Sequence, residues 1–406
     1  MDKNKANVPK LRFPGFTDPW EQRKVCELIE DYIEKTEIQN QYPVLTSSQQ
    51  KGIVFQEDYF ADRQVTTNDN VGYFILPKGY FTYRSRSDTN LFVFNRNDII
   101  HRGIISYYYP VFCVKDTDSN FFLRRINFGM NSQLAMAAEG TGQHVLSLSK
   151  FKNMITTVPS LPEQKQIGLL FEHLDHLITL HQRKLKHLQD KKKGLLQKMF
   201  PKDGEDFPEI RFPGFTDPWE QRKMGEMTCL ITKGTTPIDK SGNGNINFVK
   251  IENIDSSSGE INISSKISEE EHNGYLKRSQ LQENDILFSI AGTLGRVTSV
   301  NKGILPANTN QALAIIRLKT GCLEYVKTYL KGKAVSDFIK KNPTIGAQPN
   351  LSLEQVGNLN IDLPSFKEQQ EIGTFFNELD HLITLHQRKL NHLQEQKKAL
   401  LQQMFV

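Results

Sequence analysis

Basic and amide side chains in two segments of this 406-residue chain have the chemistry needed to bind a nucleic acid. Lysine and arginine neutralise phosphates, and asparagine and glutamine hydrogen-bond the edges of bases. Between Lys78 and Lys152, ten basic residues stand against five acidic ones, interleaved with Tyr and Phe. The candidate contacts are Arg84, Arg86, Arg102, Arg124, Arg125, Lys233, Lys250, Arg296, Asn308, Asn310 and Gln311.

A second interpretation of the same residues is that the aromatic rings form a core and the arginines a solvated face. The stretch from Glu27 to Asp69 is acidic, so this whole region is nearly neutral. Asn and Gln are also common in loops. The net charge of +5 permits an anionic partner without demonstrating one. Charge alone leaves both interpretations open.

Motifs of several catalytic classes are absent from the sequence. It contains no GxxxxGK[ST], HExxH or GxSxG, and no Asn/Asp-Pro-Pro-aromatic motif of amino-methyltransferases. The cysteines, Cys26, Cys113, Cys229 and Cys322, are far apart and form no CxxC. We therefore expect no catalytic residue and no metal site, and the cysteine usage fits a reducing cytoplasm. No apolar run approaches the roughly 20 residues of a membrane span.

An internal repeat divides the chain into two tandem halves. Arg12–Lys24 and Arg211–Lys223 are the same thirteen residues, RFPGFTDPWEQRK, and LDHLITLHQRKL occurs at 174–185 and 379–390. The stretches between these markers differ, so we interpret the identical parts as a frame and the others as exchangeable inserts. The predicted domains are an N-terminal frame segment 1–24, insert domains 25–157 and 224–362, a central helical spacer and linker 158–223, and a C-terminal helical spacer 363–406.

Within the repeated frame segment, TDPWE has the signature of a helix start. Asp18 and Asp217 suit the N-cap, Pro19 and Pro218 the first helical position, and Glu follows three residues after each cap. The sequence thus predicts a shared turn and helix start at each site.

Apolar residues spaced by three and four predict two long helices with a heptad seam. The seam consists of Phe171, Leu174, Ile178, His181, Leu185, Leu188 and Leu195, and of Phe376, Leu379, Ile383, His386, Leu390, Leu393 and Leu400. A parallel pair would bury Lys192 against Lys397, which is costly, so we expect antiparallel packing. We expect His181 and His386 to be hydrogen-bonded core residues. Alternatively, each helix packs only on its own domain.

The predicted fold is therefore α+β. Two mixed α/β domains are held apart by an antiparallel two-helix coiled coil, in a tandem repeat with pseudo-two-fold symmetry.

Motifs along nearly the whole chain resemble the specificity subunit of type I restriction-modification systems. They include WEQRK from Trp20 and Trp219, KGTTP at Lys233–Pro237 and FVKIENI at Phe248–Ile254. Others are DILFSIAGTLG at Asp285–Gly295, NxNQA at Asn308–Ala312, and PSxxEQxxIG at Pro159–Gly168 and Pro364–Gly373. The first insert lacks KGTTP, so the two inserts are expected to read different sequences.

The resemblance implies a non-catalytic subunit that recognises an asymmetric, bipartite DNA target. Each insert would be a target-recognition domain in the major groove, with half-sites roughly one helical turn (~34 Å) apart. Two methyltransferase subunits would carry S-adenosylmethionine and modify adenine. Two motor-nuclease subunits would use ATP and Mg, so this chain itself would bind no cofactor. The alternatives are a coiled-coil scaffold whose inserts bind proteins, and an enzyme with an unrecognised active site.

Overall fold

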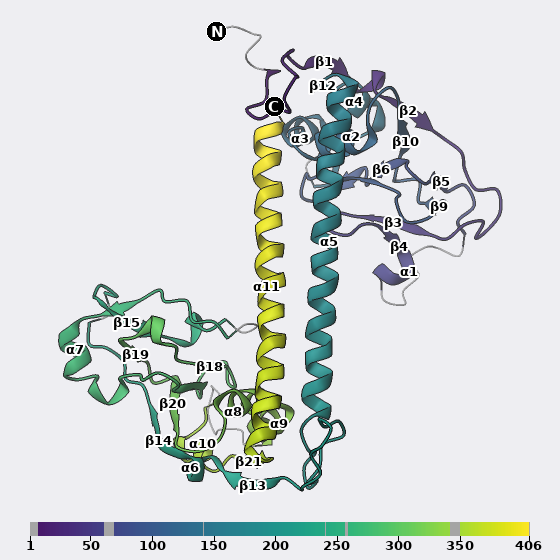
Figure 1. Ribbon diagram of the computed structural model, residues 1–406. Coiled ribbons are helices and arrows are strands. Elements are labelled where there is room, and N and C mark those ends of the chain that lie inside the picture. Colours follow the sequence, from purple (N-terminus) through teal and green to yellow (C-terminus); the bar gives the residue numbers. More distant parts are fainter. Residues whose placement is uncertain are drawn as a thin grey trace. The chain divides into compact units, whose positions relative to one another are not determined.

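The computed structural model describes residues 7–60, 69–140, 142–239, 241–255, 259–341 and 350–405. The chain forms two compact units, which we call unit 1 (residues 1–179 and 391–406) and unit 2 (residues 180–390). Two long helices, α5 (Leu161–Lys198) and α11 (Phe366–Met404), each contribute residues to both units (Figure 1). The insert boundaries 25–157 and 224–362 remain predictions, although α5 and α11 begin shortly after them.

Unit 1 is built around a four-stranded sheet of strand order β2-β10-β6-β8. Short helices cover it, and two-stranded sheets β3-β4, β5-β9, β7-β11 and β1-β12 surround it. The strands are β1 (Glu21–Lys24), β2 (Ile29–Tyr32), β3 (Leu45–Ser48), β4 (Gly52–Phe55), β5 (Phe74–Pro77), β6 (Phe81–Tyr83), β7 (Arg86–Ser87), β8 (Phe94–Arg96), β9 (Arg102–Ile105), β10 (Val111–Val114), β11 (His144–Val145) and β12 (Ile155–Val158). The short helices are α1 (Gln56–Tyr59), α2 (Ser119–Asn127), α3 (Asn131–Ala137) and α4 (Leu148–Lys152).

Unit 2 repeats this plan with a four-stranded sheet of order β14-β20-β17-β18. A three-stranded sheet, β16-β15-β19, and the pair β13-β21 complete it. The strands are β13 (Glu220–Lys223), β14 (Thr228–Lys233), β15 (Ile246–Val249), β16 (Lys266–Ile267), β17 (Ile286–Ser289), β18 (Val297–Ser299), β19 (Ala307–Thr309), β20 (Leu313–Leu318) and β21 (Asn360–Leu363). The short helices are α6 (Met224–Met227), α7 (Glu269–Asn273), α8 (Leu323–Leu330), α9 (Lys333–Lys341) and α10 (Leu353–Gly357). The prediction of two mixed α/β domains is confirmed.

The helix predicted at TDPWE is wrong in both copies. Glu21–Lys24 is strand β1, which pairs antiparallel with β12, and Glu220–Lys223 is strand β13, which pairs with β21. Trp20 and Trp219, immediately before these strands, are buried. The cap signature was overridden because tertiary pairing gives these backbone groups partners and buries the indole rings.

The long helices pack antiparallel to each other within each unit. In unit 1 the ring of Phe171 on α5 lies 5.8 Å from that of Phe405, the residue after α11, and Lys397 of α11 pairs with Asp175. In unit 2 Lys192 of α5 pairs with Asp380 of α11. Both lysines therefore meet a carboxylate instead of each other, as predicted from the charge pattern.

The predicted seam residues lie in or beside the cores. Phe171, Leu174, Leu185, Leu188, Phe376, Leu379, Ile383, Leu390 and Leu393 are buried, and Ile178, His181, Leu195, His386 and Leu400 are half-buried. His181 and His386 meet in unit 2 with their Nδ1 atoms 2.9 Å apart. In this contact one Nδ1 carries a hydrogen and donates it, and the other Nδ1 accepts the hydrogen bond. The two rings can therefore form this bond only while at least one of them is neutral.

A buried ion pair joins the frame segment of each unit to the start of a long helix. In unit 1 the Nε and Nη2 atoms of Arg12 donate to both carboxylate oxygens of Glu163, at 2.9 and 2.7 Å. In unit 2 Arg211 donates to Glu368 in the same way, at 2.7 and 2.8 Å. The glutamate side chains are 1% and 0% exposed, so each carboxylate depends on its arginine for its charge partner.

We predict that Arg12→Met lowers the free energy of unfolding by about 3 kcal/mol, because it leaves a buried carboxylate unpaired. The matched control is Arg23→Met, which removes an exposed ion pair with Glu27 and should cost at most about 1 kcal/mol. Urea unfolding measures both. In the double variant Arg12→Met/Glu163→Met we expect part of the loss to be recovered. Equal losses for Arg12→Met and Arg23→Met would contradict the role assigned to the buried pair.

The histidine pair predicts a pH dependence of stability. Burial, the neighbouring His181 and the charge of Lys184 lower the pKa of His386. The unfolded chain therefore binds this proton at a higher pH than the folded chain, and stability falls as the pH drops below about 6.5. We expect His386→Gln to reduce this slope between pH 7 and 5, measured by thermal unfolding. His392→Gln, at an exposed position on the same helix, should leave the slope as in the wild type; an unchanged slope in His386→Gln would refute the assignment.

Candidate nucleic-acid interface

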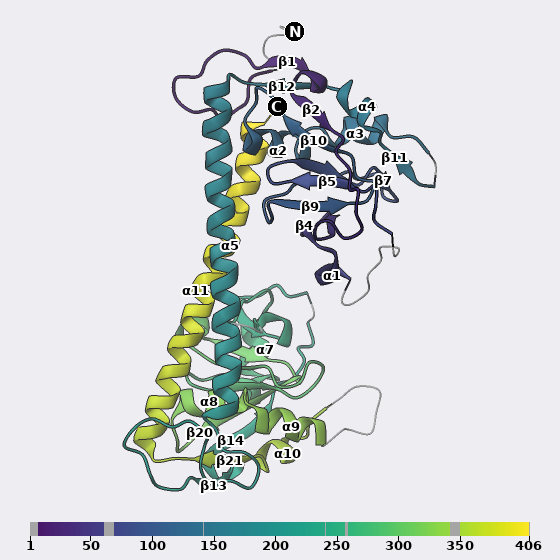
Figure 2. The same cartoon turned by 90° about the vertical axis from the view of Figure 1, so that its right-hand side faces the viewer.

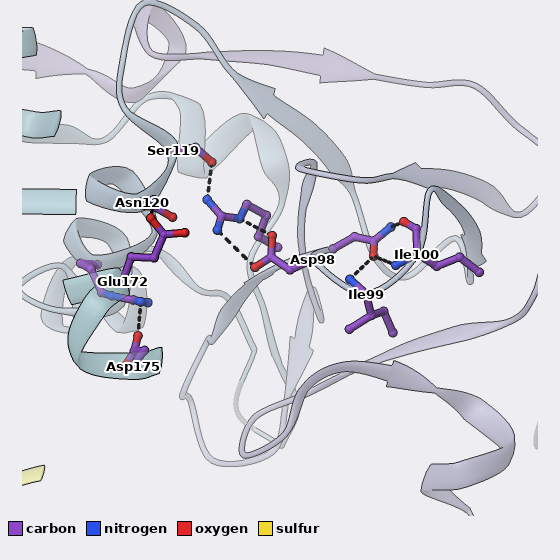
Figure 3. Close-up of polar contacts among 10 residues, drawn as sticks. Asp98, Ile99, Ile100, Ser119, Asn120, Glu172 and Asp175 are labelled. Atoms are coloured by element: carbon purple, nitrogen blue, oxygen red, sulfur yellow. Dashed lines mark hydrogen bonds and ion pairs between the residues drawn. The ribbon is translucent and has the colours of Figure 1, made fainter. Parts of the chain in front are cut away.

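Two of the arginines predicted to contact a nucleic acid have structural partners in unit 1. Arg125 on α2 is 4% exposed, and its guanidinium donates to the hydroxyls of Thr156 and Thr157 on β12 at 2.9 and 2.8 Å. Burial lowers the pKa of Arg125 to about 10. Its neighbour Arg124 pairs with Asp175 of α5, beside a bond from Asn120 to Glu172 (Figure 3). These contacts fasten α2 to α5 and β12, so we assign both arginines to the fold.

Two candidates in unit 2, Asn308 and Arg296, also support the fold. Asn308 is fully buried, and its amide nitrogen donates to the Leu276 carbonyl and the Ser279 hydroxyl. The Nη1 atom of Arg296 donates to two carbonyls, those of Ile251 and Ile254, at 3.1 and 2.9 Å. These side chains hold loops in place; Asn308 has no surface left for a ligand, and Arg296 is half-buried.

Asn310 has a local role of the same kind, because its side-chain oxygen accepts a bond from the Ala312 amide at the start of β20. It remains half-buried.

The remaining candidates lie at the surface of their own unit. Arg84 and Arg86 are exposed, and neither forms an ion pair with the residues that the structure describes. Arg102 is partly neutralised by Glu34 at 3.7 Å. Lys250 lies 3.9 Å from Glu252, whereas Lys233 and Gln311 are exposed.

Two exposed tyrosines beside Arg86 were not among the predicted contacts. Tyr107 and Tyr108 are 59% and 37% exposed, with ring centroids 4.3 Å apart, and the guanidinium of Arg86 lies 4.4 Å above the Tyr108 ring. The hydrogen bond from Tyr107 to Tyr108 raises the pKa of Tyr107. The run of three tyrosines, 107–109, was a visible signal. However, only the structure shows that Tyr109 packs against a core, whereas Tyr107 meets the buried Tyr73 ring edge to face, with centroids 6.3 Å apart, and stays exposed.

Unit 1 thus exposes arginines without an ion-pair partner among the described residues together with aromatic rings, and unit 2 exposes the Lys233 ammonium and the Gln311 amide. Such surfaces suit phosphates and base edges. Within the described residues, no group of three or more His, Cys, Asp or Glu side chains is arranged to hold a metal. None of the described helices is long and apolar enough to cross a membrane.

Comparison with known proteins identifies the family. A sequence model described as the type I restriction modification DNA specificity domain matches residues 17–190 and again residues 216–395. The chain belongs to this family. The two specificity domains thus cover most of the sequence, and each includes one copy of the frame strand that pairs with the end of its insert.

Relatives of this chain are specificity subunits of type I restriction enzymes. The type I restriction enzyme MjaVIII specificity subunit of Methanocaldococcus jannaschii is 24% identical over 284 residues, 66% of this chain and 65% of that protein. The putative MjaX specificity subunit of the same organism is 23% identical over 279 residues, 66% of this chain and 62% of its own length. The matched region thus spans slightly less than two thirds of these relatives. The crystal structure of the type I S subunit from M. genitalium shares the fold, with a TM-score of 0.59, 14% identity, and coverage of 98% of this chain and 99% of that one.

We predict that Arg125→Ala in the first specificity domain lowers the free energy of unfolding by roughly 2–3 kcal/mol. The change leaves two buried threonine hydroxyls without their charged donor. Arg84→Ala, at an exposed position of the same domain, should change stability by less than about 0.5 kcal/mol. Urea unfolding compares them. If the two substitutions cost the same, the division into structural and surface arginines is wrong.

Proposed function

We propose that this chain is the sequence-specific DNA-recognition subunit of a type I restriction-modification complex. The observation that carries the proposal is the presence of two specificity domains in one chain, built on one sheet order but with different exposed side chains. Arg84, Arg86, Tyr107 and Tyr108 are exposed on the first domain, and Lys233 and Gln311 on the second. Different surfaces on a common frame suit an asymmetric, bipartite target.

The chemistry would reside on partner subunits. In this proposal, methyltransferase subunits bind S-adenosylmethionine and modify adenine, and motor-nuclease subunits use ATP and Mg. The duplicated frame would present two equivalent attachment sites, which favours two copies of each partner. The present chain would supply recognition and scaffolding, without catalysis of its own.

Exposed leucines on the long helices favour the hypothesis that a methyltransferase subunit binds there. In unit 2, Leu180 of α5 and Leu385 of α11 are each 54% exposed, and Leu382 is 44% exposed. Leu180 and Leu385 occupy the same position of the identical LDHLITLHQRKL segments, so the frame offers this apolar contact twice. Large apolar side chains exposed together mark surfaces that a partner covers.

A cytoplasmic location is part of the proposal, because bacterial and archaeal DNA lies there. Cys26, Cys113, Cys229 and Cys322 are all free thiols, which suits a reducing compartment.

Single-molecule sequencing of genomic DNA for N6-methyladenine tests the function. We predict that cells expressing this chain with the methyltransferase of its system methylate one bipartite motif. Cells with the methyltransferase alone should not methylate it. Exchanging residues 25–157 for another insert should change one half of the motif and keep the other, because each insert forms its own sheet.

Unchanged methylation in the absence of the chain, with the methyltransferase present and active, would contradict the proposal. A scaffold that binds only proteins would then be favoured. The affinity for DNA separates these two functions. If the chain binds several phosphates, the association constant for DNA falls steeply as the salt concentration rises, with a log-log slope of about −0.9 per phosphate. A scaffold that binds only proteins has no affinity for DNA.

A further inference from the structure

The main sheets of the two units have equivalent edges. In unit 1 the start of the central strand β10 lies beside the ends of β2 and β6, with Val111 opposite Tyr32 and Thr82. In unit 2 the start of β20 lies beside the ends of β14 and β17, where Leu313 is opposite Ser289. We call these equivalent places the reading edges. They comprise residues 84–86 and 106–108 in unit 1, and 233–236 and 310–311 in unit 2.

The reading edge of unit 1 is held in shape by main-chain bonds that leave its charged groups free. The amide and the hydroxyl of Ser85 both donate to the Tyr108 carbonyl, at 3.1 and 2.7 Å. Arg84 and Arg86 on either side of Ser85 are exposed, and Arg86 stacks on Tyr108. The exposed Tyr108 ring and the two arginines contribute little to the core, so this edge is available for a ligand.

The reading edge of unit 2 is equally fixed but carries different chemistry. A Cβ at Gly234 would lie 2.1 Å from the carbonyl oxygens of Thr309 and Asn310, so only glycine permits this close approach. The Thr236 hydroxyl bonds Gln311 across the edge, and the Arg278 Nε donates to the Thr235 hydroxyl at 3.1 Å. No aromatic pair like that of unit 1 is found among these residues. The edge presents hydroxyl, amide and ammonium groups.

Each insert closes with a segment that contains Leu-Ser-Leu, at residues 146–148 and 351–353, and this closing segment reaches the same edge. In unit 1, β11 pairs with β7, directly after Ser85 (Figure 2). In unit 2, Asn350 bridges to Ala291, just after β17. Leu146 and Leu351 then enter the cores, and Ser147 and Ser352 cap the following helices α4 and α10. A common segment therefore supports each edge, while the residues displayed there differ.

We propose that these reading edges are the base-reading surfaces, and that Arg84 and Arg86 of unit 1 read guanine in the half-site of that unit. This inference rests on the proposed function. The arginine fork matches guanine O6 and N7, and each such contact discriminates by about 1–3 kcal/mol, or roughly 5- to 150-fold. The stack of Arg86 on Tyr108 orients the guanidinium, which reduces the entropy lost on contact. Unit 2, with Lys233 and Gln311, reads a different half-site.

Selection of randomised duplex DNA by the full chain, co-purified with its methyltransferase subunit, tests the proposal. The edge variants are Arg84→Gln/Arg86→Gln in unit 1 and Lys233→Gln/Gln311→Ala in unit 2. The matched controls are Lys115→Gln and Lys319→Gln, exposed lysines that directly follow β10 and β20 and so lie at the opposite ends of the same central strands. Circular dichroism and thermal unfolding establish that all variants fold.

The wild type should enrich a bipartite motif with guanine in one half. Arg84→Gln/Arg86→Gln should lose the guanine preference, weaken binding of the selected site at least about fivefold and keep the other half. The unit 2 variant should alter only that other half, and each lysine control should keep the full motif.

If the wild type selects a motif and the edge variants select the same motif, the base-reading role of these edges is refuted, while the proposed function of DNA recognition stands. Controls that alter the motif as strongly as the edge variants would also refute this role. A wild type that enriches no motif would contradict the proposed function itself.

Discussion

The architecture depends on two buried carboxylates, Glu163 and Glu368, at the first turns of the long helices. Each is almost fully removed from solvent, and such a charge is tolerated only with a partner of good geometry. That partner is the arginine that opens the repeated segment, Arg12 or Arg211, which donates two parallel bonds. The segment must therefore dock on the helix start in each unit. The amide preceding each arginine also donates to the carbonyl of Gln403 or Lys198 at the end of the other long helix, at 3.0 and 2.8 Å. This constraint gives a physical reason why an arginine opens the repeated segment in both units.

The residue after each glutamate connects this frame to the insert. Gln164 donates to the Pro159 carbonyl at 2.9 Å and accepts from the Asp118 amide at 3.0 Å. Gln369 donates to the Pro364 carbonyl at 2.9 Å and accepts from the Cys322 amide at 3.0 Å. At this joint each insert offers a main-chain amide, which every residue type except proline possesses. An insert can therefore change the side chain at this position and keep the bond to glutamine, while side-chain contacts such as Arg124 with Asp175 add to the attachment in unit 1.

Periodicity and repetition made the frame predictable, whereas the site residues were not. Heptad spacing located α5 and α11, and the lysine positions indicated their direction, because both depend on residue type along one helix. The helix start expected at Asp18 failed because strand pairing with β12 is a long-range contact. Arg125 and Arg84 are the same residue type in the same basic stretch, yet one bonds two buried threonines and the other faces solvent. The two arginines differ because α2 packs on β12 and buries Arg125. This packing is a long-range contact, which the residues next to each arginine do not reveal.

The contrast between buried and exposed polar residues also bears on how specificity changes. Replacing Arg125 or Asn308 removes hydrogen bonds that hold β12 or a loop in place. A substitution that changed the DNA target at these positions would therefore destabilise the folded protein. Arg84 has no ion-pair partner among the described residues, and the Tyr108 carbonyl, not its ring, holds the neighbouring loop through Ser85. Substitutions at such positions alter the displayed groups while the main-chain bonds persist. Recognition can therefore diverge between the two units at the sheet edges, because the interactions that define the fold do not pass through the side chains displayed there.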